Sequence, residues 1–152
     1  MFLKAGLPTV ALLMSLASKA SATVTFKYIS AADAAAKVEA TKTVAAPDYI
    51  ADGPDFLLSF AMRNKPGKVE QHADWNDEII IQEGDVLLNY GGISVNAKPA
   101  GPGEIRGDSI NGGKSVLMHP GDVVTIPAGM PHQMLIQTPI MRYILLKTRK
   151  DH

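Results

Sequence analysis

The chain has no cysteine, few aromatic residues and no long run of basic side chains. Without cysteine it cannot form disulfides, thiolate metal sites or a cysteine nucleophile. Aromatic residues make up 6% of its 152 residues, with a single tryptophan, which argues against a dedicated sugar-binding protein. Lysine plus arginine and aspartate plus glutamate number 15 each, so the excess positive charge that nucleic acid binding requires is missing and we expect no nucleic acid partner.

Long apolar runs are also missing, except near the N-terminus. Lys4 precedes the mostly apolar residues 6–17, and Ala20-Ser21-Ala22 has the small-residue pattern of a cleavage site. This pattern predicts a signal peptide over residues 1–22, cleaved after Ala22 and too short for a stable membrane span. We therefore expect a periplasmic or secreted protein with no membrane association after cleavage. The alternative is that this segment stays in place as a membrane anchor.

The rest of the chain is long enough for one domain with one core. Residues 30–41 are predicted to form a helix, because Ser30 can cap it and alanines fill its interior. We assign residues 23–54 to this helix and an arm, and residues 55–152 to a β-barrel. The predicted strands are 56–62, 68–72, 77–82, 85–90, 115–119, 122–126, 132–136 and 142–148.

Short strands at this spacing indicate an all-β double-sheet barrel, or jelly roll. The glycine- and proline-rich residues 91–113 interrupt the pattern, and only residues 93–96 there suggest a brief strand. Long loops in compact domains are usually functional or mobile, so we expect 91–113 to form a flap near one end of the barrel.

One segment combines a turn glycine, a β-branched strand, a proline–glycine turn and a histidine. Gly121 is followed by five residues, Pro127, one residue, Gly129, two residues and His132. Valine, isoleucine and threonine favour a strand, and Pro127 and Gly129 end it. The segment resembles the second motif of the cupin superfamily, which implies the cupin double-stranded β-helix and a metal-binding imidazole at His132.

A partial first cupin motif lies upstream. Asp77 stands where the family has glutamate, with six residues between it and Gly84. His72, with four residues between it and Asp77, matches the second histidine of the motif. Glu70 stands where the family usually has its first histidine. The resemblance, over roughly residues 55–148, therefore implies a divalent metal site with an altered ligand set: Glu70, His72, Asp77 and His132.

Strand alternation supports this set, because Glu70 and His72 share one face, and Asp77 shares a face with two isoleucines of the next strand. Glu78 is the alternative to Asp77; spacing from Gly84 favours Asp77, but a β-bulge would reverse this. Two imidazoles with carboxylates suit iron, manganese, nickel or zinc. Without a metal, the same residues could form an acid–base pair, a polar binding cluster or a structural hydrogen-bond network.

Other residues are candidates for substrate binding around such a pocket. Arg106 could hold a substrate carboxylate through two hydrogen bonds, and Trp75 could stack on a ring at the pocket mouth. Core packing is the simpler interpretation for the remaining candidates, with pocket contact as a secondary role: Tyr90, Met134 and Tyr143.

These features predict an exported, metal-dependent enzyme that acts on a small organic molecule. Glu70 would be a fourth ligand or, with His72 beside it, a catalytic base. An extra carboxylate suits proton abstraction, as in a lyase or isomerase, and two histidines with a carboxylate also suit iron-dependent dioxygenase chemistry. The competing hypothesis is a non-catalytic periplasmic binding module for a sugar or small acid. The family resemblance also implies a homodimer.

Overall fold

The computed structural model describes residues 26, 28–40 and 48–150, so the signal peptide predicted for residues 1–22 lies outside the described part. One helix, α1 (Ala31–Ala40), precedes the strands. No helix in the described ranges has the length and apolar character needed to cross a membrane. The strands are β1 (Asp48–Asp52), β2 (Phe56–Arg63), β3 (Val69–His72), β4 (Trp75–Glu83), β5 (Val86–Tyr90), β6 (Ile93–Val95), β7 (Lys98–Gly101), β8 (Glu104–Gly107), β9 (Ser109–Asn111), β10 (Lys114–Met118), β11 (Val123–Ile126), β12 (His132–Ile136) and β13 (Met141–Arg149).

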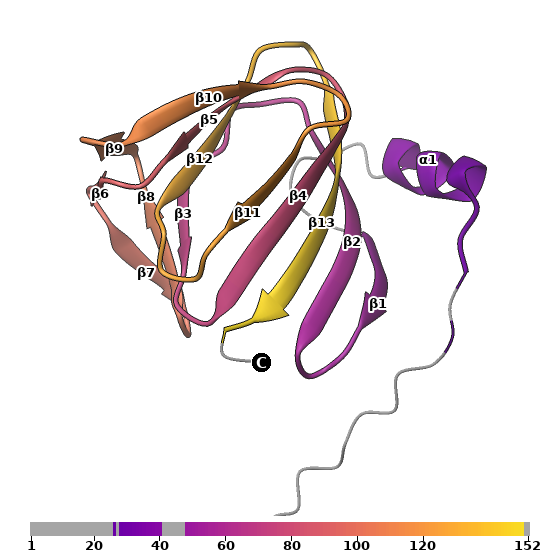
Figure 1. Cartoon of the computed structure of the whole chain (residues 1–152), viewed down its shortest axis with the longest axis horizontal. Helices are drawn as coiled ribbons and strands as arrows, with labels where there is room; N and C mark the ends of the chain where they lie inside the picture. Colours follow the sequence, from indigo (N-terminus) through magenta and orange to yellow (C-terminus); the bar gives the residue numbers. More distant parts are fainter. Residues whose placement is uncertain (1–25, 27, 41–47, 151–152) are drawn as a thin grey trace, which may run out of the picture.

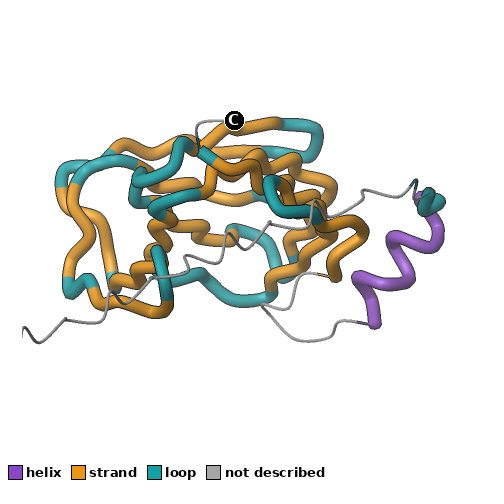
Figure 2. Tube along the Cα trace, turned by 90° about the horizontal axis from the view of Figure 1, so that it is seen from below, coloured by secondary structure: helices purple, strands orange, loops and turns teal. Residues whose placement is uncertain are grey.

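Two antiparallel sheets form the body of the molecule (Figure 1). One has the order β1-β2-β13-β4-β11, and the other has the order β10-β5-β12-β3-β8-β7. A short β6-β9 ribbon completes the strands, while α1 lies at one end, beyond the strand layers (Figure 2). The expected all-β jelly roll is confirmed.

The core lies between the two sheets and is filled by alternate residues of the central strands. Ile79 and Ile81 of β4 meet Val86 and Leu88 of β5, and each is at most 2% exposed. β-Branched and leucine side chains pack well on such pleated faces. On β4, the same alternation carries Asp77 to the inner face, at the end of the core.

The helix begins as its sequence predicts. The hydroxyl of Ser30 accepts a hydrogen bond from the Asp33 backbone N–H at 3.1 Å and donates one to the Asp33 carboxylate at 2.7 Å. This satisfies one of the N–H groups left free in the first turn. Among the helix residues whose side chains are described, Ala34 is the buried one, 5% exposed.

The segment 91–113 is not the flap that its glycine and proline content predicted. It forms four short strands, of which β8 pairs along its whole length with β3 and β7 extends the sheet beyond β8. Backbone pairing with β3 outweighed the turn-rich local composition. A second difference is β1, a strand that pairs with β2 although its residues were assigned to the N-terminal arm.

Candidate metal centre

Strand register brings the candidate residues onto one inner face of the six-stranded sheet. His132 of β12 lies opposite Glu70 of β3, and Glu70 lies opposite Arg106 of β8. His72 lies opposite Glu104 in the same β3–β8 pair. Side chains directly opposite one another on antiparallel strands point to the same face about 5 Å apart, so neighbouring strands present these groups together.

The ring of His72 is held by Glu104. Its Nδ1 is 2.7 Å from a Glu104 carboxylate oxygen, and because an ionised carboxylate can only accept, Nδ1 is the donor. In the neutral ring, Nε2 then keeps its lone pair. This Nε2 atom is buried and makes no hydrogen bond, although Asp77 Oδ2 is 3.3 Å away. The structure thus leaves a buried acceptor aimed at a carboxylate.

The ring of His132 is also held through its Nδ1, in this case by a backbone carbonyl. Its Nδ1 donates to the carbonyl oxygen of Met130 at 3.0 Å, which leaves Nε2 as an acceptor in the neutral ring. The two imidazole centroids are 5.3 Å apart, and both side chains are 4% exposed. The Pro127–Gly129 turn precedes β12 and sets where His132 begins that strand.

Asp77 approaches both imidazoles from the other sheet. Its Oδ2 is 3.3 Å from His72 Nε2 and 3.5 Å from His132 Nε2, while Oδ1 accepts a hydrogen bond from Lys147 at 2.8 Å. Burial would raise the pKa of Asp77, but the two imidazoles and the Lys147 ammonium hold it well below its usual range. Asp77 is therefore held in its ionised form by these three neighbours.

The Asp77 charge also acts on His72. Burial lowers the pKa of His72, but the neighbouring Asp77 carboxylate outweighs burial, so the pKa lies above its ordinary value. A proton on Nε2 of His72 is one way to relieve the apposition of a lone pair and a carboxylate. A cation bound at the same place is the other.

Glu70 closes the side of the cluster toward solvent. Its Oε1 accepts a hydrogen bond from Arg63 at 2.8 Å, and its Oε2 lies 3.7 Å from His72 Nε2 and 3.6 Å from Arg106. Burial raises the pKa of Glu70, but the charges of Arg63 and Arg106 bring it below the ordinary value. Glu70 is thus an ionised carboxylate with one oxygen fixed and the other turned to the imidazoles.

These atoms fit a bound divalent ion. One ligand atom each from Glu70, His72 and His132 lie within 4.8 Å of one another. Four atoms bound at about 2.1 Å in tetrahedral geometry would be about 3.4 Å apart. The distance of 3.7 Å from Glu70 to His72 is close to that value, and Asp77 Oδ2 lies 3.3 Å and 3.5 Å from the two imidazoles but outside this group of three. Each imidazole also donates its other nitrogen to an oxygen, as metal-bound histidines do.

The remaining candidates lie in different surroundings. Met134 and Tyr143 are buried in the core, at 7% and 5% exposure, and Tyr90 packs against its edge. Trp75 lies under the guanidinium of Arg149, whose central carbon is 4.2 Å from the ring centroid. Arg106 hydrogen-bonds Glu104 at 2.9 Å and reaches Glu70, so it belongs to the wall of the cluster.

The structure shows which of Asp77 and Glu78 faces the cluster. Asp77 faces inward at 3% exposure, while Glu78 contacts Thr148 at 3.5 Å on the other face of β4.

Glu104 and Lys147, which contact His72 and Asp77, were not among the residues that the sequence pointed to. Glu104 lay in the expected flap, and the ion pair of Lys147 depends on the β13–β4 register, in which Lys147 lies opposite Asp77.

Access to the cluster is from the side of its charged wall. The imidazoles are closed off, but the side chains of Glu70, Glu104 and Arg106 are 23%, 28% and 35% exposed. A cavity of about 340 Å³ adjoins this wall at Arg106. A larger cavity, about 430 Å³, lies at α1 and is lined mainly by residues of the helix and the five-stranded sheet. Neither cavity is lined by Glu70, His72, Asp77 or His132.

Comparison with known proteins gives the fold. No protein-family pattern matches the sequence, and no curated protein matches it. Solved structures do match. A cupin-2 domain containing protein from Shewanella frigidimarina is 15% identical with a TM-score of 0.53, covering 76% of this chain and 91% of its own.

Two further structural neighbours carry more specific names. KdgF from Halomonas sp. is 15% identical with a TM-score of 0.50, over 68% of this chain and 78% of its own. Hydroquinone 1,2-dioxygenase from Sphingomonas sp. TTNP3, with 4-hydroxybenzoate bound, is 12% identical with a TM-score of 0.50, over 71% and 69%. At these identities the likeness establishes the architecture.

Proposed function

Since the chain has the cupin fold, we propose that it is an exported, metal-dependent enzyme that acts on a small organic molecule. His72, His132 and Asp77 would hold the ion, and Glu70 would be either a fourth ligand or, if it stays free of the ion, the catalytic base. Two imidazoles and carboxylates suit iron, manganese, nickel or zinc. When bound, such an ion supplies Lewis acidity or activates water or dioxygen.

One observation carries the proposal. Both imidazoles have Nδ1 committed to an oxygen, and the buried Nε2 of His72 faces a carboxylate without a hydrogen bond. Because buried polar groups without partners cost free energy, this atom needs either a proton shared with Asp77 or a cation, and the metal content of the protein distinguishes the two. A cation between the imidazole and the carboxylate satisfies both.

The chain's own residues suit proton-abstraction chemistry of the lyase or isomerase type. Glu70 is ionised and partly exposed, so its Oε2 can accept a proton from a substrate at the open side. Arg63 holds the other oxygen and keeps the carboxylate aimed at the cluster. Because both arginines lower the pKa of Glu70, it would be a weak base that needs an acidified substrate proton.

The dioxygenase alternative is supported by one neighbour, hydroquinone 1,2-dioxygenase, of similar fold. A non-catalytic binding module is the other alternative. Glu70→Gln separates these hypotheses once a substrate is known: loss of turnover with retained ligand binding supports a base, while a binder has no turnover to lose.

The first test is the metal content of the full chain, purified without chelator or metal-affinity resin and measured by mass spectrometry. We expect near-stoichiometric metal in the unmodified protein and none in His72→Ala/His132→Ala. His119→Ala removes an exposed imidazole elsewhere and should leave the metal content unchanged. Circular dichroism shows whether each variant is folded. His132→Gln replaces only one imidazole, by a polar side chain, and should also lower the metal content. A folded protein that neither carries nor takes up metal would overturn the proposal.

Export is tested separately. We expect the protein recovered outside the cytoplasm to begin at Thr23, as N-terminal sequencing would show. An intact N-terminus in a membrane fraction would instead support the anchor.

A further inference from the structure

We infer that the cavity beside the metal centre binds the oxyanion group of the substrate, so that the substrate is a small organic acid. This inference rests on the proposed function and names its substrate class. The residues that line the cavity are Lys68, Asn96, Ala97, Lys98, Pro99, Arg106, Gly107 and Asp108.

The charges around this cavity are predominantly positive. Lys98 of β7 lies directly opposite Arg106 of β8, and Lys68, just before β3, lines the same space. Like charges directly opposite on paired strands destabilise a sheet. Arg106 is already paired with Glu104 and Glu70, whereas Lys68 and Lys98 are exposed, so the two lysines are the charges most free to meet a bound anion.

Nothing in the described part of the chain neutralises the two lysines. No carboxylate of the described residues lies within ion-pair distance of Lys68 or Lys98. The one acidic residue in the lining is Asp108, whose carboxylate accepts a hydrogen bond from Asn96 at 3.0 Å. The lining thus keeps a net positive charge.

Arg106 connects the cavity to the metal centre. One of its terminal nitrogens bonds Glu104 at 2.9 Å and the Ile105 carbonyl at 3.0 Å, and the other lies 3.6 Å from Glu70. An arginine has five N–H donors, so these contacts leave donors for an oxyanion. Glu70 and Glu104 fix the plane of the guanidinium, which suits two-point binding of a carboxylate or phosphate.

The same geometry orients the substrate. Glu70 and Glu104 beside the metal centre repel an oxyanion, whereas the lysines of the neighbouring cavity attract one. An organic acid would therefore place its oxyanion among Lys68, Lys98 and Arg106. Its other functional group would then extend past Glu70 toward the imidazoles, on the exposed side of the cluster.

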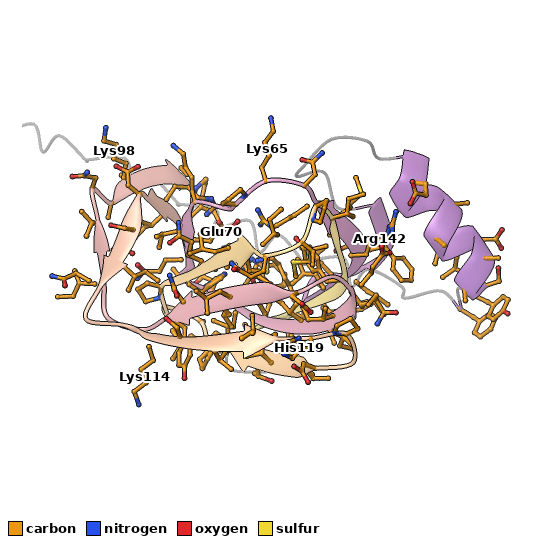
Figure 3. All side chains as sticks on the ribbon, turned by 90° about the horizontal axis from the view of Figure 1, so that it is seen from above. Lys65, Glu70, Lys98, Lys114, His119 and Arg142 are labelled. Carbon is orange, nitrogen blue, oxygen red and sulfur yellow. The ribbon has the colours of Figure 1, made fainter. Side chains whose placement is uncertain are left out.

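The test is calorimetric titration of the full chain, metal-loaded, with malonate and with inorganic phosphate. We expect saturable binding of at least one of them, weakened about tenfold by Lys98→Gln and by Lys68→Gln, since each removes a charge-assisted hydrogen bond. Lys114→Gln is the matched control. Lys114 is exposed on β10, at the opposite edge of the same sheet (Figure 3), and its loss should leave the affinity unchanged. Tighter malonate binding would indicate a carboxylate substrate, and tighter phosphate binding a phosphorylated one.

Failure of this inference differs from failure of the proposed function. If metal binds but neither anion binds at about 10 mM, or if Lys114→Gln weakens binding as much as Lys98→Gln, the oxyanion cavity is wrong and the metal centre stands. If the folded His132→Gln variant loses its metal yet still binds the anion through Lys68 and Lys98, the cavity is independent of the ion.

Discussion

At the scale of single residues, the cluster depends on where each histidine places its hydrogen atom. Met130 holds the Nδ1 proton of His132 through a neutral carbonyl, but Glu104 holds that of His72 through a charged carboxylate. A carboxylate partner makes the opposite nitrogen a more basic ligand. Of the two imidazoles, His72 is thus the one whose affinity for an ion depends on a neighbouring side chain.

Replacing Glu104 should therefore weaken metal binding without removing a ligand. We expect Glu104→Ala to lower the metal affinity about 10- to 100-fold, in the range found for such outer partners, and Glu104→Gln to lower it less, because an amide oxygen still accepts from Nδ1. Competition with a chromogenic chelator measures this. Glu83→Ala, on an exposed glutamate of β4, is the control. Equal affinities for Glu104→Ala and the unmodified protein would show that Glu104 does not orient His72.

A second residue-scale prediction concerns pH and lies away from the cluster. The hydrogen bond and charge of Asp85, 2.9 Å from His119 Nδ1, raise the pKa of the exposed His119 above 6.5. A raised folded-state pKa means that the pair stabilises the protein fully below pH about 6.5 and that this contribution disappears as pH rises through the folded-state pKa. NMR titration should show a raised pKa that falls in Asp85→Asn. An unchanged His119 titration in that variant would exclude the pairing.

At the scale of elements, the sequence is most informative where its signals are local. The Gly121–His132 segment combines strand, turn and histidine within twelve residues, and the structure places His132 at the start of β12 as predicted. The spacing from Gly84 was enough to favour Asp77 over Glu78 as the inward-facing carboxylate. Glu104 could not be found, because its position depends on β8 pairing with β3 across more than thirty residues of chain. Local composition there indicates turns, and pairing between distant strands leaves no local signal.

The turns that separate these elements make a testable contribution. Gly84 and Gly112 both have positive φ, 79° and 71°. A Cβ on Gly84 would lie 2.2 Å from the Ile140 carbonyl oxygen, whereas one on Gly112 would meet nothing within 4 Å. We expect Gly112→Ala to lower the free energy of unfolding by about 1–2 kcal/mol from backbone strain, and Gly84→Ala by about 2 kcal/mol more from overpacking. Urea denaturation compares the two variants. Equal losses of unfolding free energy would mean that the β4–β5 turn rearranges to accommodate the extra methyl group.

At the scale of the whole molecule, the candidate ligands come from both sheets. Asp77 belongs to β4 of the five-stranded sheet, and Glu70, His72 and His132 belong to the six-stranded sheet. A bound ion would join the two layers at the end of the core. For a chain without disulfides, this would be a cross-link that folding itself assembles.

Metal loading should accordingly stabilise the protein as a whole. At free metal about 1,000 times the dissociation constant, the gain is about 4 kcal/mol, which for a domain of this size raises Tm by about 10 °C or more. Differential scanning calorimetry before and after chelation measures it. The folded His72→Ala/His132→Ala variant should show no such difference, and a chelator-insensitive Tm in the unmodified protein would contradict the cross-link.

The two edges of the six-stranded sheet differ in their tendency to recruit another strand. β7 is exposed along its length and carries Lys98 and Pro99, a charge and a missing N–H group, which are the usual protections against edge-to-edge aggregation. β10, at the other edge, exposes Val116 and Leu117 at 41% and 49%. We therefore expect self-association, whether an ordered pair of subunits or a misfolded aggregate, to begin along β10. The cationic edge at β7 would then stay open to solvent.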